Sequence, residues 1–95
     1  MIIRIVKMTF DHRKVEDFLR IFSDAQHKIE AFPGCKGVDL TRDVLQSNIF
    51  MTISIWENLA SLDEYRKSEL FKTTWSATKL LFSERPDAWS VEKIR

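Results

Sequence analysis

The chain opens with a segment in which apolar residues recur on two alternating faces, from Ile2 to Phe10. One parity holds Ile2, Val6, Met8 and Phe10, and the other holds Ile3, Ile5, Lys7 and Thr9. A period of two predicts a β-strand, because successive side chains point to opposite faces of a sheet. We expect the more apolar even set, which Arg4 interrupts, to face helices, and the odd set to face a second surface.

The period changes after Asp11, where a helical stripe begins. Its apolar members are Val15, Phe18, Leu19, Phe22, Ala25, Ile29 and Phe32. Recurrence every three or four residues is typical of an amphipathic helix, and Pro33-Gly34 ends this one. Asp11 is a candidate N-cap, since its carboxylate can accept hydrogen bonds from the free amide groups of the first turn. Lys36 to Asp43 then alternates, which predicts a second strand.

The second half of the chain again predicts a strand followed by helices. Ile49 to Trp56 is rich in residues that favour strands, and both of its faces carry apolar side chains. Two helical pieces follow, from about Ser61 to Lys67 and from Glu69 to Ser83. Pro86 stops the second piece, and Ala88 to Ile94 can form a last strand.

The resulting order of elements, βαββαβ, predicts one ferredoxin-like α+β domain over residues 1–95, an antiparallel sheet with both helices on one face. The other face would then be uncovered. We expect it to expose Ile3, Ile5, Phe50 and Trp56 beside Lys7, Thr9, Thr52 and Ser54. Such a patch is too apolar to leave in water, so we expect a homodimer that closes through the two sheet faces.

Composition narrows the class of protein. The chain has 15 Lys and Arg against 14 Asp and Glu, a net charge of +1, and 44% apolar residues. These values indicate neither disorder nor a nucleic-acid-binding surface. Cys35 is the single cysteine, and we find neither a leader pattern nor an apolar run of transmembrane length. We therefore expect a cytoplasmic protein without nucleic-acid or membrane partners.

Aromatic residues gather where the third strand passes into the later helices, between Trp56 and Trp75. Large aromatics at helical spacing more often form core than a ligand site, although a pocket lined by core residues satisfies both interpretations. His12 and His27 fall outside the apolar stripes, and with Cys35 they give no recognisable metal-ligand spacing. We expect no bound metal.

Three segments resemble the antibiotic biosynthesis monooxygenase family of dimeric α+β barrels. They are the opening strand from Ile2 to Phe10, the corner from Phe32 to Gly37 and, most specifically, the stretch from Trp56 to Phe71 with its Ser-x-x-Phe ending. The resemblance implies a small-molecule cavity between sheet and helices. It also implies oxidation of an aromatic or quinol compound by O₂ without metal or flavin, so we expect no cofactor.

The family also contains haem-degrading members, in which an Asn, a Trp and an iron-ligating His are implied to act. The matching positions of this chain hold Val6, Tyr65 and Trp75. An indole nitrogen only donates hydrogen bonds and cannot ligate iron, whereas imidazole can. We therefore do not expect haem degradation.

Many members resemble this chain but carry a proton-accepting His where Tyr65 stands. Tyrosine is a poorer base because its ordinary pKa is about 10, yet its hydroxyl can orient a substrate oxygen. Arg4 is a candidate to stabilise the substrate anion. The expected catalytic residues are thus Tyr65 and Arg4, and the expected substrate-binding residues are Val6, Met8, Phe22, Trp56, Tyr65, Phe71 and Trp75.

Two functions remain open from the sequence. The first is a homodimeric, cofactor-independent monooxygenase that acts on a small aromatic, phenolic or quinol compound. The second is a non-catalytic dimeric ligand-binding or stress-related module that kept the cavity and lost the proton acceptor.

Overall fold

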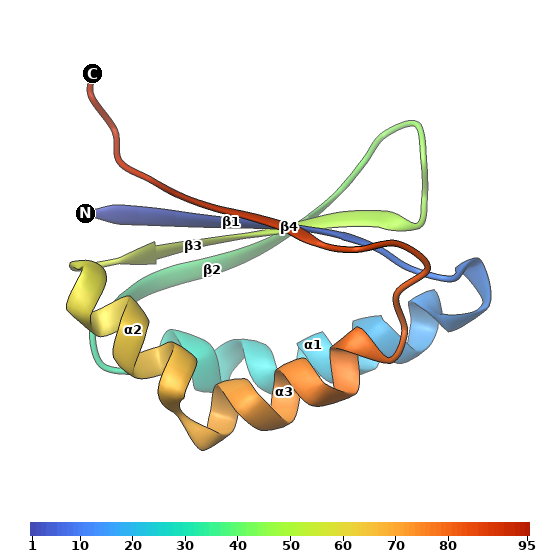
Figure 1. Ribbon diagram of the computed structural model, residues 1–95, viewed down its shortest axis with the longest axis horizontal. Helices are drawn as coiled ribbons and strands as arrows, with labels where there is room; N and C mark the ends of the chain where they lie inside the picture. The colour runs from blue at the N-terminus through green and yellow to red at the C-terminus, as the bar shows by residue number, and fades with distance from the viewer.

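The computed structural model describes residues 1–95 and has two layers, a sheet and a set of helices that cover one of its faces (Figure 1). The elements are β1 (Ile2–Thr9), the 3₁₀ turn η1 (His12–Lys14), α1 (Val15–Glu30), β2 (Cys35–Arg42), β3 (Ile49–Trp56), α2 (Leu59–Lys67), α3 (Glu69–Lys79) and β4 (Asp87–Val91). The strand order is β2-β3-β1-β4, and every pair is antiparallel. This arrangement confirms the predicted ferredoxin-like fold.

Most element boundaries lie close to those predicted, and the differences have local causes. Asp11 caps η1 by accepting a hydrogen bond from the amide of Arg13 at 2.9 Å, and α1 starts only at Val15. At the other end of the chain, α3 stops at Lys79 because the segment after it turns back to β1. There the amide of Ser83 donates to the carbonyl of Thr9 at 2.9 Å.

The register of β1 against β3 corrects one prediction. Met8 lies opposite Phe50, and Ile2 lies opposite Trp56. Residues that are directly opposite in an antiparallel pair share a face, so Phe50 and Trp56, with Thr52 and Ser54 between them, face the helices with the even residues of β1. The prediction that they lie on the uncovered face is wrong. Both faces of β3 are apolar, so its sequence alone did not show which face meets the helices.

The core lies between the sheet and α1. The largest fully buried side chains are those of Trp56, Phe10 and Phe50. The predicted stripe of α1 packs onto them, and the rings of Phe10 and Phe18 stack with centroids 4.1 Å apart. The apolar face of α1 therefore covers the sheet.

The corner between α1 and β2 is held against the start of α2. Gly34 has a φ of +86°, which favours glycine, and its carbonyl accepts a hydrogen bond from the amide of Glu57 at 2.8 Å. A Cβ at this position would run into the side chain of Ser61. Gly34 thus allows the close approach that places α2 over the sheet.

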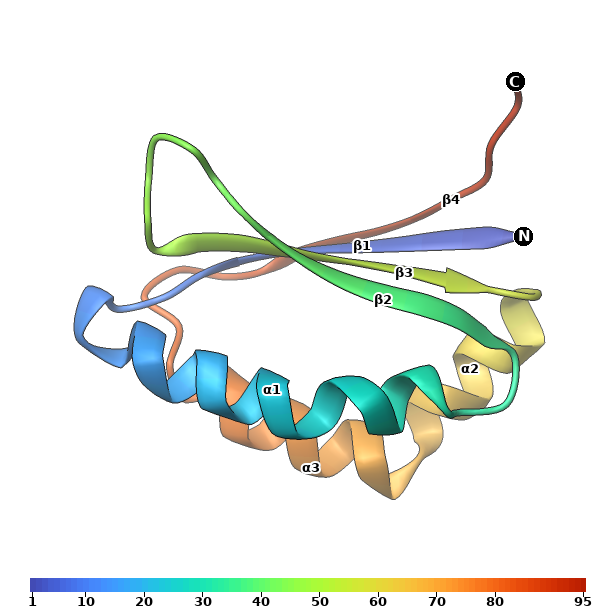
Figure 2. The same cartoon turned by 180° about the vertical axis from the view of Figure 1, so that it is seen from behind.

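The other face of the sheet carries no helix (Figures 1 and 2). By the observed register its side chains include Ile3, Ile5, Met51, Ile53, Ile55, Trp89 and Val91. The hairpin between β2 and β3 and the C-terminal segment both rise from the sheet on this uncovered side, as Figure 2 shows. At the hairpin tip, Val44 and Leu45 are 95% and 90% exposed.

None of the helices is both long enough and apolar enough to span a membrane.

Candidate functional site

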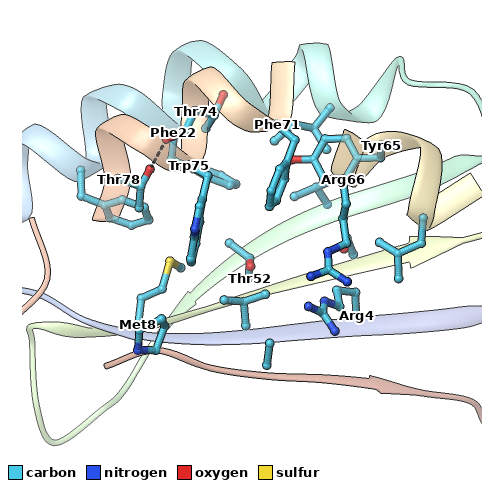
Figure 3. A pocket seen from close by; sticks show the side chains of 18 of the residues that line it. Arg4, Met8, Phe22, Thr52, Tyr65, Arg66, Phe71, Thr74, Trp75 and Thr78 are labelled. Carbon is cyan, nitrogen blue, oxygen red and sulfur yellow. Dashed lines mark hydrogen bonds between the residues drawn. The ribbon is translucent and has the colours of Figure 1, made fainter. Parts of the chain in front are cut away.

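A cavity of about 340 Å³ lies between the helix-facing side of the sheet and the helices (Figure 3). All four strands and all three α-helices contribute to its wall. Ligand sites in proteins typically begin at about 300 Å³, so this space fits one small molecule. Eleven of its 19 lining residues are hydrophobic, which makes an apolar ligand surface a good match.

The structure brings most of the predicted site residues to this cavity. Its lining includes Arg4, Val6, Met8, Phe22, Tyr65, Phe71 and Trp75. Trp56 is the exception: it is 0% exposed and does not belong to the lining. Its indole stacks on the ring of Tyr65, with centroids 4.9 Å apart, so it supports the cavity wall from behind.

A continuous row of aromatic rings forms the helix side of the wall. Tyr65 meets Phe71 edge to face at 5.3 Å between centroids, and Phe71 stacks with Trp75 at 6.0 Å. The Ser-x-x-Phe motif explains the turn in this row. The hydroxyl of Ser68 donates to the carbonyl of Tyr65 at 2.6 Å and accepts from the amide of Phe71 at 3.1 Å, which ends α2 and caps α3.

Tyr65 keeps its proton in this environment. Burial, followed by the neighbouring Cys35 thiol, raises the pKa of Tyr65 to about 12. Its hydroxyl makes no hydrogen bond to the rest of the chain, and no side-chain polar atom is both fully buried and unpaired. The hydroxyl is therefore accessible within the site and serves as a hydrogen-bond donor rather than as a base.

Arg4 extends from the middle of β1 onto the helix-facing side, where its register partners are Ser54 and Ser90. One of its guanidinium nitrogens, Nη1, donates to the hydroxyl of Ser90 at 3.0 Å. Burial first and the charge of Arg66 second lower the pKa of Arg4. Arg66 reaches the same end of the cavity from α2, and Figure 3 shows the two guanidinium groups close to each other.

Among the lining residues that the sequence interpretation missed, Arg66 is the one that adds positive charge. Arg66 is exposed at the cavity mouth, and a charged residue on a helix is ordinarily expected to be solvated. Its spacing from an apolar residue of α2 nevertheless indicated a position facing the sheet. Arg66 follows the buried Leu62 by one helical turn, and residues four apart lie on the same side of a helix.

The cavity is charged at one end and apolar at the other. Arg4 and Met8 both line it from β1 and are four residues apart, which corresponds to about 13 Å along a strand. Figure 3 shows Met8, Phe22 and Trp75 away from the two arginines, with Thr52 between the two ends. An elongated ligand with one polar end would match this distribution.

The residues for metal or haem ligation are not assembled here. No group of three or more His, Cys, Asp or Glu side chains is placed to hold a metal ion. No histidine lines the cavity, and Trp75 forms part of the wall at the position where a haem-ligating His was considered. An indole supplies no lone pair for iron, so these residues do not fit a haem group.

Fold and cavity together define a class: small ferredoxin-like α+β proteins with an aromatic-lined ligand space between sheet and helices. The chain belongs to the antibiotic biosynthesis monooxygenase (ABM) family, whose sequence model matches residues 1–76. The matched part includes Arg4, Tyr65, Arg66 and Trp75 and ends within α3.

Solved structures share this fold over nearly their whole length. A crystal structure named antibiotic biosynthesis monooxygenase is 18% identical, covers 100% of both chains and has a TM-score of 0.93. A conserved protein from Methanosarcina mazei Go1 is 19% identical, with 98% of this chain and 93% of that chain covered and a TM-score of 0.91. The Rv0793 protein of Mycobacterium tuberculosis is 13% identical, with 99% and 95% covered and a TM-score of 0.91. No curated protein matches the sequence.

Proposed function

We propose that the protein is a cofactor-independent monooxygenase that oxidises a small phenolic or quinol compound with O₂. The observation that carries the proposal is the joint placement of a protonated Tyr65 and a charged Arg4 in a small aromatic-walled cavity. Membership of the ABM family supports the choice of O₂ chemistry. A solved structure named antibiotic biosynthesis monooxygenase has the same fold.

The proposed reaction balances without an external reductant. A phenol with a free ring carbon para to its hydroxyl reacts with one O₂ to give a quinone and one water. A hydroquinone, whose free ring carbons are ortho to a hydroxyl, gives a hydroxyquinone and one water in the same way. One oxygen atom is added to the ring, the other leaves in water, and the substrate supplies all four electrons. The protein then has to bind the substrate, exclude bulk water and stabilise the phenolate that gives the first electron to O₂.

Arg4 supports loss of the phenol proton, the step that forms the phenolate. Tyr65, with a pKa of about 12, does not take that proton at neutral pH, and no histidine lines the cavity. A guanidinium beside the phenol stabilises its anion and so lowers the substrate's pKa, which lets solvent accept the proton. The hydrogen bond that Arg4 donates to Ser90 involves Nη1 only, so the remaining donors of Arg4 are available to the substrate oxygen.

The later steps begin when the phenolate gives one electron to O₂. After one electron passes to O₂, the substrate radical and superoxide combine to form a carbon–oxygen bond that carries a peroxide. Loss of the ring proton and departure of the outer oxygen as water leave the carbonyl of the quinone. Tyr65 contributes by donating a hydrogen bond that orients the substrate oxygen, and the aromatic wall keeps the intermediate out of bulk water.

We also propose that the active form is a homodimer closed through the uncovered sheet faces. Ile5 and Ile53 lie opposite each other in the middle of that face, and further isoleucines surround them. A specific interface buries about 800 Å² per partner, which a four-stranded sheet face can supply. The hairpin tip with Val44 and Leu45 rises on the same side, where it can contact the partner.

A non-catalytic ligand-binding or stress-related module is the second candidate. The absence of histidine from the cavity lining favours it, because such a protein needs the cavity but no proton acceptor. Oxygen uptake with a panel of hydroquinones separates the two candidates. Turnover by the parent that falls in Tyr65→Phe and Arg4→Ala supports the enzyme, whereas ligand-induced thermal shifts without turnover support the binding module.

A further inference from the structure

We propose that the cavity binds aromatic carboxylates of the hydroxybenzoate type, with the carboxylate held between Arg4 and Arg66. This inference rests on the proposed function in that it names the substrate class for the same cavity. It adds Arg66 as a binding residue for the carboxylate, which is already ionised when the ligand binds. Where a hydroxyl is ortho to that carboxylate, the donors of Arg4 that Ser90 leaves free can contact both groups.

The first support is that neither arginine has a carboxylate partner within the chain. The ion pairs of the protein are Asp11–Arg13 and Asp17–Arg20, on its surface. Arg4 donates only to Ser90, and Arg66 makes no side-chain hydrogen bond. Their guanidinium groups nevertheless lie close together at one end of the cavity (Figure 3). Two like charges at a partly desolvated site are stabilised by an anion placed between them.

The one acidic residue in the cavity wall does not supply that anion. Asp87 belongs to the lining, but its register partner on β1 is Lys7. Lys7 lies on the uncovered side of the sheet, whereas Arg4 lies on the helix-facing side. Because opposite residues of an antiparallel pair share a face, the carboxylate of Asp87 is directed away from the two arginines.

The second support is the chemistry that a pair of guanidiniums selects. A guanidinium presents parallel N–H donors that match the two oxygens of a carboxylate. A carboxyl group with a pKa of about 4 is ionised at neutral pH, whereas a phenol with a pKa of about 10 is not. The lining holds no histidine, and its one carboxylate, Asp87, is directed away from the arginines. A phenol without a carboxylate therefore leaves both cations without an anion until it has lost its own proton.

The rest of the cavity selects an aromatic ring. Its far end is formed by Met8, Phe22 and Trp75, and Phe71 lies between that end and Tyr65. Stacked and edge-to-face contacts with such side chains favour a flat ring. A volume of about 340 Å³ suits one or two rings. An inorganic anion would leave this apolar space unfilled.

Isothermal titration with benzoate and benzamide tests the inference without requiring turnover. The two compounds have nearly the same shape, and neither is a quinol. We expect benzoate to bind at least about tenfold more tightly than benzamide. We expect Arg66→Gln to abolish this preference by weakening benzoate and leaving benzamide unchanged. Arg4→Gln should act in the same direction, with its folding checked by thermal unfolding.

Lys67→Gln is the matched control. Lys67 follows Arg66 on α2, is also exposed and does not line the cavity, so its substitution removes the same charge nearby. We expect it to leave benzoate affinity unchanged. Equal affinity for the two ligands, binding of neither, or an equal effect of Arg66→Gln and Lys67→Gln would overturn the inference.

A second pair of compounds separates this inference from the proposed function. Gentisate is hydroquinone that carries one carboxylate. If benzoate binds selectively but the protein consumes no oxygen with gentisate or hydroquinone, the proposed ligand class is supported and the monooxygenase proposal is wrong. If the protein oxidises hydroquinone but binds benzoate no more tightly than benzamide, the monooxygenase proposal is supported and the carboxylate inference is wrong.

Discussion

The indole of Trp56 lies stacked against the phenol ring of Tyr65, with ring centroids 4.9 Å apart and 26° between the ring planes. The Nε1 of Trp56 donates to the hydroxyl of Ser54 at 2.9 Å, so the indole is fixed to the strand that carries it. The position of Tyr65 in the cavity wall is therefore set by the core of the sheet. A residue outside the cavity thus positions one in its wall.

Removal of this support should destabilise the fold. Trp56→Ala deletes a fully buried side chain, and such a deletion costs about 3–5 kcal/mol in the free energy of unfolding. Urea unfolding followed by circular dichroism measures the loss. Trp75→Ala, at a half-buried position on the cavity wall, should cost less. A smaller loss for Trp56→Ala than for Trp75→Ala would contradict the assignment of Trp56 to the core.

The ionisation of Tyr65 can be measured directly because it is the only tyrosine in the chain. Its pKa is raised to about 12 in the folded protein, against about 10 for a free tyrosine. Ultraviolet absorbance of tyrosinate should therefore appear near pH 12 in the native protein and near pH 10 in urea.

The raised pKa of Tyr65 also predicts how stability depends on pH. Folding favours the neutral phenol, so its contribution is fully present below pH 10 and is lost as pH rises through about 12. Tyr65→Phe should lack this alkaline loss. A native titration midpoint at the ordinary tyrosine value would show that the ring is not desolvated.

The corner at Gly34 gives a prediction with an internal control. Gly34 and Gly37 both have positive φ values, of +86° and +152°, so alanine at either position strains the backbone by about 1 kcal/mol or more. Only at Gly34 would the new Cβ also meet a neighbour, the side chain of Ser61. Gly34→Ala should thus lower the urea midpoint more than Gly37→Ala does. Equal losses would mean that the approach of α2 to this corner is not tight.

The dimer proposal predicts a mass of twice the 11.2 kDa chain in light scattering at micromolar concentration. Ile53→Glu places a charge at the centre of the uncovered face and should yield a folded monomer. Leu59→Glu, at an exposed leucine of α2, is the control and should leave the dimer intact. A monomeric parent protein would exclude the proposal.

The sequence predicted the elements because their periods are clear. The stripe of α1 and the β3 boundaries at Ile49 and Trp56 agree with the structure. The prediction of which side of the sheet carries Phe50 and Trp56 was wrong. That assignment depends on pairing with a strand about 40 residues away, which local alternation does not encode.

The site shows the same limit. Val6, Met8, Phe22, Phe71 and Trp75 were proposed from resemblance and apolar spacing, and all five line the cavity. The charged side chain that completes it could not be recognised from its residue type alone, because an exposed arginine on a helix is most often solvated. Only its position one turn after a buried leucine indicated otherwise.

The most direct test of the proposed monooxygenase is the fate of isotopically labelled O₂ with purified protein stripped of metals and flavins. We expect one O₂ to be consumed per quinone formed, with one labelled oxygen atom in the quinone and the other in water. We also expect a rate at least about a hundredfold lower in Arg4→Ala, since loss of a preorganised charge at a developing anion has about this effect. Quinol oxidation that releases hydrogen peroxide and leaves no label in the product, or no oxygen uptake at all, would contradict the proposal.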